Sequence, residues 1–142
     1  MRSFACFRLS ARIGRAAALY VAVVFAAGFL LGAARILLVS PRVGELAAVA
    51  LEAPIMLWVS WRACGLSLRR FRIRGPGQAA AVGGLAFALL MMAELGFGAL
   101  AFGRSASQFL QAFGTPAGAL GLACQVVFGC FPVLSDRLAA SG

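Results

Sequence analysis

The sequence predicts an all-α integral membrane protein, a bundle of four transmembrane helices. Of its 142 residues, 63% are hydrophobic and 12% are charged, whereas soluble globular domains are about 45–50% apolar and about 25% charged. Four stretches approach the roughly 20 apolar residues that a helix needs to cross the hydrocarbon core, namely 16–39, 44–63, 78–102 and 117–134. We therefore expect residues 1–142 to form a single membrane domain.

The basic residues predict the orientation of these spans. The segment 1–15, a loop expected at 64–77 and the residues after the fourth span all lie on one side of the membrane. This side holds ten arginines and one aspartate, a net charge of +9, and the other side and the spans hold three arginines and three glutamates. Because basic residues favour the cytoplasmic side, both termini are expected to be cytoplasmic. The run 16–39 is longer than a signal-peptide core, so we expect an uncleaved first span.

The arginines near the second span also predict a partner. Each arginine beside an acidic leaflet contributes about 1 kcal/mol, so we expect anionic lipid on the cytoplasmic face. No nucleic-acid-recognition motif accompanies the basic residues, and we expect no nucleic acid. All 13 basic residues are arginine, in a chain rich in Ala, Gly and Leu, which indicates a GC-rich bacterial genome and the bacterial cytoplasmic (inner) membrane. The candidate lipid-contact residues are Arg62, Arg69, Arg70, Arg72 and Arg74.

The second span carries a carboxylate and a proline within the apolar run "ALEAPIMLW" at 50–58. Pro54 removes one helical hydrogen bond and its ring clashes with the carbonyl of Ala50. The sequence therefore predicts a kink near Pro54, with Glu52 beside the freed carbonyl.

Polar residues of all four spans are expected to converge in the outer half of the bilayer. A helix rises 1.5 Å per residue, which places one polar side chain per span, and two in the second, at similar depths. Ionisable groups inside a membrane almost always face the bundle and find partners. The sequence thus predicts a buried polar cluster of Arg35, Glu45, Glu52, Glu94 and Gln125.

Within this cluster, Arg35 is expected to pair with Glu52 or Glu94, leaving the other carboxylate protonated. On the first span Gly28 and Gly32 share a face with Arg35, a Gly-x-x-x-Gly step that predicts close approach of another backbone.

The outer rim holds two further arginines, Arg42 and Arg104, each of which could pair with Glu45 instead. In the outer loop 103–116, Ser105 or Ser107 is expected to cap a short interfacial helix that begins near Gln108.

The residue types present give little support for an enzyme. Without histidine the chain has no Ser-His-Asp or Cys-His arrangement and no haem or His-containing zinc site. It also lacks a phosphate-binding Gly-rich loop, and Cys6, Cys64, Cys124 and Cys130 form no CxxC pair. We expect no catalytic residue, cofactor or metal.

Two functional classes remain open. One is a structural or accessory membrane protein whose polar cluster specifies helix packing and which associates with a second copy or a partner subunit. The other is a small oligomeric carrier or channel in which Glu52 and Glu94 bind a proton or a cation.

Overall fold

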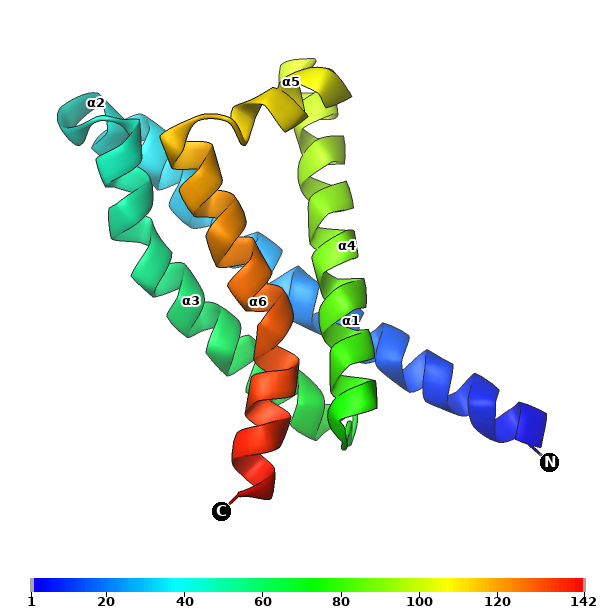
Figure 1. The fold of residues 1–142 in the computed structure, drawn as a ribbon. Coiled ribbons are helices and arrows are strands. Elements are labelled where there is room, and N and C mark those ends of the chain that lie inside the picture. Colours follow the sequence, from blue (N-terminus) through cyan, green and yellow to red (C-terminus); the bar gives the residue numbers. More distant parts are fainter. Residues whose placement is uncertain (1, 142) are drawn as a thin grey trace.

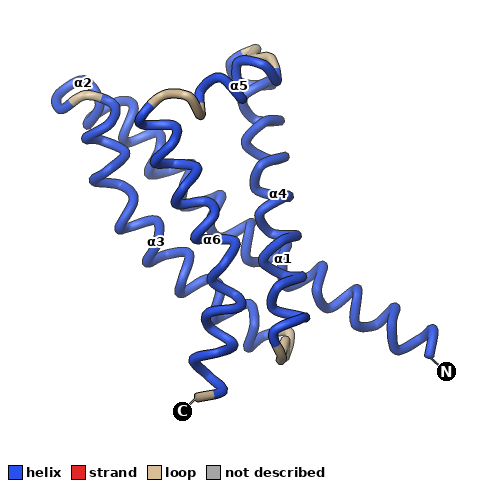
Figure 2. The backbone as a smooth tube through the Cα atoms, in the orientation of Figure 1, coloured by secondary structure: helices blue, strands red, loops and turns tan. Residues whose placement is uncertain are grey.

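The computed structural model describes residues 2–141, with side chains from Leu9 onward, and the regular secondary structure of this part of the chain is all helical, with short loops between the helices (Figures 1 and 2). Four long helices are α1 (Arg2–Ala34), α3 (Glu45–Arg70), α4 (Pro76–Phe102) and α6 (Pro116–Ala140). Each belongs to a segment long and apolar enough to cross a membrane: Leu9–Val43, Glu45–Arg70, Pro76–Phe102 and Pro116–Ala140. The prediction of an all-helical, multi-pass membrane protein is supported at this level.

The four long helices form a ring. α1 packs against α3 and α4, and α6 packs against the same two helices from the other side. Both termini and the α3–α4 turn lie at one end, which we call the basic end because most of the arginines lie there. The short helix α5 (Ala106–Ala112) lies at the opposite end, the α5 end, where the helices spread apart (Figure 1).

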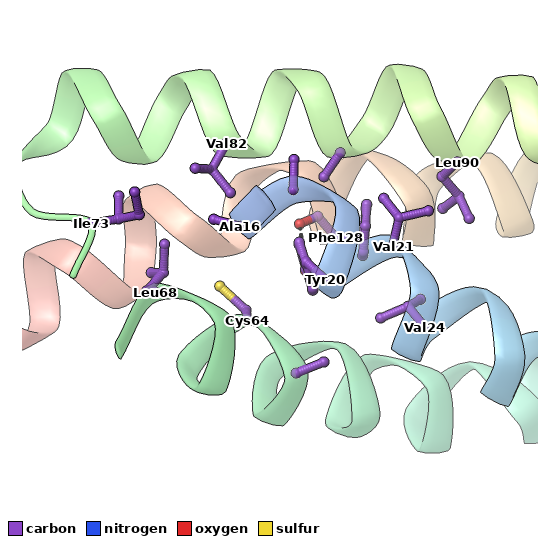
Figure 3. Close-up of a cluster of buried hydrophobic side chains, with 13 residues drawn as sticks. Ala16, Tyr20, Val21, Val24, Cys64, Leu68, Ile73, Val82, Leu90 and Phe128 are labelled. Carbon is purple, nitrogen blue, oxygen red and sulfur yellow. Dashed lines mark hydrogen bonds between the residues drawn. The ribbon is translucent and has the colours of Figure 1, made fainter. Parts of the chain in front are cut away.

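A buried apolar core fills the bundle towards the basic end. Figure 3 shows Tyr20 of α1 at its centre, between Cys64 of α3, Val82 of α4 and Phe128 of α6. The rings of Tyr20 and Phe128 stack with their centroids 4.2 Å apart. This stacking joins two helices that lie diagonally across the ring.

Tyr20 also completes the hydrogen bonding of α6. Pro132 lies inside α6 and, having no N–H, cannot bond to the carbonyl of Phe128 four residues earlier. The hydroxyl of Tyr20, which is fully buried, donates to this carbonyl at 2.9 Å. A tyrosine from α1 thus supplies the donor that the proline removes.

α4 and α6 come close together at Gly83 and Gly129. A Cβ atom on Gly83 would lie 2.1 Å from the carbonyl oxygen of Gly129, so only glycine fits at this point. The step predicted to bring two backbones together was Gly28 to Gly32, and that prediction is wrong. A Cβ on Gly28 would meet only the Met56 methyl group, at 3.3 Å, and one on Gly32 would meet nothing within 4 Å.

α3 continues to Arg70, so the predicted loop 64–77 is too long at its N-terminal side. The reason is packing: Ser67 and Leu68 are buried, and the Ser67 hydroxyl donates to the carbonyl of Ala16 in α1. Contacts with α1 therefore extend the helix through a sequence whose charges favoured a loop.

α3 ends in a Schellman turn. The Ile73 N–H donates to the Leu68 carbonyl at 3.0 Å and the Arg72 N–H to that of Arg69 at 3.2 Å. Ile73 and Leu68 are both in the core, which is the apolar contact typical of this motif. Arg72 takes the left-handed position, with φ 51°, where glycine is usual.

Two side chains hold the α3–α4 turn from other helices. Arg12 of α1 donates to the carbonyls of Phe71, at 3.0 and 2.7 Å, and Arg72. Asp136 of α6 accepts a hydrogen bond from the Gly75 N–H at 2.9 Å. Arg12, which the charge pattern assigned only to a basic flank, therefore has a structural role as well.

The first span ends in a wider helical turn that the sequence reasoning missed. After Ala34 the chain continues as a π-helix, η1 (Arg35–Val39), and then as α2 (Ser40–Val43). Pro41 explains this change, because its ring clashes with a carbonyl four residues earlier in an α-helix, and a π-turn relieves the clash. The span thus reaches Val43 rather than residue 39, and the π-helix begins at Arg35.

The predicted short helix at the outer loop is confirmed. Ser105 caps α5: its hydroxyl accepts from the Gln108 N–H at 3.3 Å, and the Gln108 side chain accepts from the Ser105 N–H at 2.9 Å. Pro54 lies inside α3 without interrupting it, and the kink near Pro54 stays a prediction.

Candidate functional site

A cavity of about 720 Å³ lies among the helices towards the α5 end. α1, η1, α3, α4, α5 and α6 all contribute to its wall. Its volume falls within the range of about 300–1,000 Å³ that holds small-molecule ligands. Glycines of α1 and α6, among them Gly28, Gly32 and Gly121, line it. At these positions the absent side chains widen the cavity instead of bringing backbones together.

Arg35 and Glu52 meet on one wall of the cavity, at the seam between the first span and α3. The distance from Arg35 Nε to Glu52 Oε2 is 2.7 Å, and the two side chains are 22% and 17% exposed. The Nε–H has no hydrogen-bond partner among the described residues, so the contact is an ion pair by distance only. Because Arg35 is the first residue of the π-helix, the wider turn sets the direction of its side chain.

Glu94 and Gln125 meet on the opposite wall, at the seam between α4 and α6. The amide nitrogen of Gln125 lies 2.7 Å from each carboxylate oxygen of Glu94. The amide oxygen of Gln125 is buried and accepts no hydrogen bond within residues 9–141. The Gln125 amide group therefore donates to Glu94, and its own oxygen is the acceptor on this seam that lacks a donor among the described residues.

These four residues do not form the single buried cluster that the sequence predicted. They form two separate pairs, and each of the four side chains is half-buried rather than buried. The physical reason is the order of the helices in the ring, since α1–α3 and α4–α6 are opposite seams. The two pairs face the same cavity from its two sides.

The rim residues also differ from expectation. Glu45 is the exposed first residue of α3 and lines the cavity. Arg42 donates to the carbonyl of Leu38 in its own helical segment. The Arg104 guanidinium lies 5.3 Å from the centre of the Phe102 ring. Among side chains 9–141 neither arginine forms an ion pair with Glu45.

Phenylalanines form a large part of the cavity wall, a feature that sequence reasoning did not single out. Phe97 of α4 makes edge-to-face contacts with Phe25, Phe29 and Phe102, at centroid distances of 6.4, 5.3 and 5.9 Å. All four rings line the cavity. The sequence contained a signal for this wall. Phe25 and Phe29 are four residues apart and Glu94 and Phe97 are three apart, so each pair lies on one face of its helix.

The five candidate lipid-contact arginines all have exposed side chains at the basic end. Arg70 lies 5.8 Å from the ring of Phe71. Contact of these residues with anionic lipid stays a prediction.

The described cysteines are reduced thiols: Cys64 is buried, Cys124 is half-buried and Cys130 is exposed. Cys6 lies outside the described side chains. Within the described part of the chain no group of three or more Cys, Asp or Glu residues could hold a metal ion.

In comparisons with protein-family models, curated proteins and solved structures, no match to this chain was found.

Proposed function

We propose that this protein is a small membrane carrier that binds its cargo in the cavity at the α5 end. The observation that carries this proposal is that both polar pairs face an open volume. Polar residues that only specify packing contact each other between closely packed helices. Here the tightly packed region lies at the other end of the bundle, and Arg35, Glu52, Glu94 and Gln125 line a cavity of about 720 Å³.

The carboxylates differ in their suitability for cargo. Glu52 is 2.7 Å from Arg35, so its charge is already compensated. Glu94 has only an amide partner. In the proposed carrier Glu94 binds cargo, while the Arg35–Glu52 pair holds the first span against α3.

A structural or accessory role is the second candidate. It is favoured by the Arg35–Glu52 contact, which closes a charge pair within the chain. In that role the chain would associate with a second copy or with a partner subunit, and its polar residues would only hold the helices in register.

We further propose that the protein resides in the bacterial cytoplasmic membrane with both termini inside. The support is the distribution of charge: the arginines at the basic end would face the cytoplasm and its anionic lipids. The cavity then lies in the outer half of the bilayer. A homo-oligomer is compatible with the carrier role, and the cavity itself is lined by a single chain.

Flux into proteoliposomes tests the carrier. Trapped pyranine reports protons, radioactive rubidium reports alkali cations, and a tetraphenylphosphonium electrode reports lipophilic cations. At least one of these should cross faster than in protein-free liposomes. In addition, Gly121→Leu should abolish the flux, since Gly121 lines the cavity and a Cβ there meets nothing within 4 Å.

The matched control is Gly65→Leu in α3. A Cβ on Gly65 would also meet nothing within 4 Å, but Gly65 does not line the cavity. This control should keep the flux. If no probe crosses faster than in protein-free liposomes, the carrier proposal is wrong. If Glu52→Gln and Glu94→Gln both fail to fold, the structural role is favoured.

A further inference from the structure

We propose that the cavity takes a monovalent organic cation with an apolar body, held by the Glu94 carboxylate; this rests on the proposed carrier function and names its cargo. The evidence is the combination of an uncompensated carboxylate, a phenylalanine wall and a volume far larger than a bare ion needs.

The charges that line the cavity do not cancel. Its described lining includes two arginines, Arg35 and Arg104, and three glutamates, Glu45, Glu52 and Glu94. Arg35 compensates Glu52, and Arg104 and Glu45 are both exposed at the rim. Glu94 is half-buried and has no cation within ion-pair distance among side chains 9–141. The sequence predicted that this unpaired carboxylate is protonated, whereas a bound cation would favour its charged form.

The neighbouring groups favour a cation over an anion or a neutral ligand. The amide nitrogen of Gln125 donates to both oxygens of the Glu94 carboxylate, and the amide oxygen of Gln125 is a buried acceptor without a donor among the described residues. Phe97, which lies on α4 like Glu94, makes edge-to-face contacts with Phe25 and Phe29 of α1. The faces of aromatic rings attract cations, and aromatic walls are used to recognise quaternary ammonium groups.

Metal ions fit the site less well. Calcium takes six to eight oxygen ligands and magnesium requires a nearly octahedral set. Glu94 and Gln125 supply one carboxylate and one amide oxygen, and no group of three or more candidate ligands occurs in the described chain. An organic cation needs fewer oxygen ligands because its apolar body is solvated by the phenylalanine wall.

The test compares two ions of nearly the same size and shape but opposite charge, tetraphenylphosphonium and tetraphenylborate. Binding is measured by equilibrium dialysis against lipid nanodiscs that contain the protein, with binding to empty nanodiscs subtracted. The wild-type protein should bind the phosphonium and not the borate. Glu94→Gln, which can still hydrogen-bond with Gln125, should weaken phosphonium binding at least about tenfold, the change expected when a desolvated charge pair loses one partner.

The matched control is Glu45→Gln, the same change at the exposed rim of the cavity. It should weaken binding less than about threefold, since exposed charges interact weakly. Gly121→Leu should remove the binding by filling the cavity. The comparison of the two ions on wild-type protein needs no variant, so it stays decisive even if Glu94→Gln does not fold.

Three results would overturn the inference in distinguishable ways. If both ions bind, and Gly121→Leu removes both while Glu94→Gln removes neither, the cavity binds ligands but does not select cations. If only the borate binds, the charge assignment is wrong. If Gly121→Leu changes the binding of neither ion and no flux is seen, the cavity is not a binding site and the proposed function fails too.

Discussion

Substitution of Gly83 by alanine should separate α4 from α6. The new Cβ would lie 2.1 Å from the carbonyl oxygen of Gly129, whereas the normal carbon–oxygen contact between helices is about 3.3–3.6 Å. The obstacle is backbone and cannot rotate away, so the helices must move apart locally by about 1.2 Å or more. Overpacking of this kind costs about 1–3 kcal/mol, and a backbone obstacle belongs at the upper end.

The adjacent glycine provides the control. A Cβ on Gly84 would meet nothing within 4 Å, so Gly84→Ala only gains helix propensity, about 1 kcal/mol. Gly83→Ala gains the same amount and loses about 3 kcal/mol to overpacking. We therefore expect Gly83→Ala to be destabilised by about 2 kcal/mol, and Gly84→Ala to be unchanged or more stable by up to about 1 kcal/mol.

The assay is reversible unfolding in mixed micelles, followed by tryptophan fluorescence. Trp61 of α3 packs edge-to-face against Phe131 of α6, at a centroid distance of 5.2 Å, so its emission reports the packing of α6. Equal free energies of unfolding for Gly83→Ala and Gly84→Ala would refute the close approach of α4 and α6.

Two further predictions use the same unfolding assay. Tyr20→Phe should lower the free energy of unfolding by about 1–3 kcal/mol, because it leaves the buried carbonyl of Phe128 without a donor. In a Pro132→Ala background, which restores a backbone N–H, the same change should cost clearly less, and an equal cost in both backgrounds would contradict the role assigned to the tyrosine. Arg72→Gly should raise the free energy of unfolding by about 1 kcal/mol, since φ is 51° at this position and glycine adopts the left-handed region without strain. A loss of stability on that change would show that the Arg72 side chain makes a contact worth more than the backbone strain.

The number and type of the long helices could be predicted because hydrophobic length and the near absence of charge within a span are properties of single segments. The pairing of Arg35 with one of two candidate carboxylates also followed from local facts, the depth of each residue and the cost of a lone charge. The choice between Glu52 and Glu94 could not be made, because it depends on the order of the helices in the ring. That order places α1 beside α3 and puts Glu94 on the opposite seam.

Two further features differ from the prediction, each for its own reason. The π-helix at Arg35 could be predicted only if Pro41 were placed inside a continuous helix. The predicted span ended at residue 39, before that proline. The predicted loop 64–77 was shortened because Ser67 and Leu68 are buried, which charge counting along the chain does not reveal.

The same residue type, glycine, has opposite effects at the two ends of the bundle, and this difference connects the fold with the proposed function. At Gly83 the missing side chain lets α4 touch the Gly129 carbonyl of α6, and this tight contact stabilises the bundle near the basic end. At Gly32 and Gly121 the missing side chains leave a volume that no other residue fills. A substitution at Gly83 should therefore change stability, and one at Gly32 or Gly121 should change ligand binding with little effect on stability. If Gly121→Leu lowered the free energy of unfolding as much as Gly83→Ala does, the space beside Gly121 would be part of the packed core, and the cavity could not serve as a binding site.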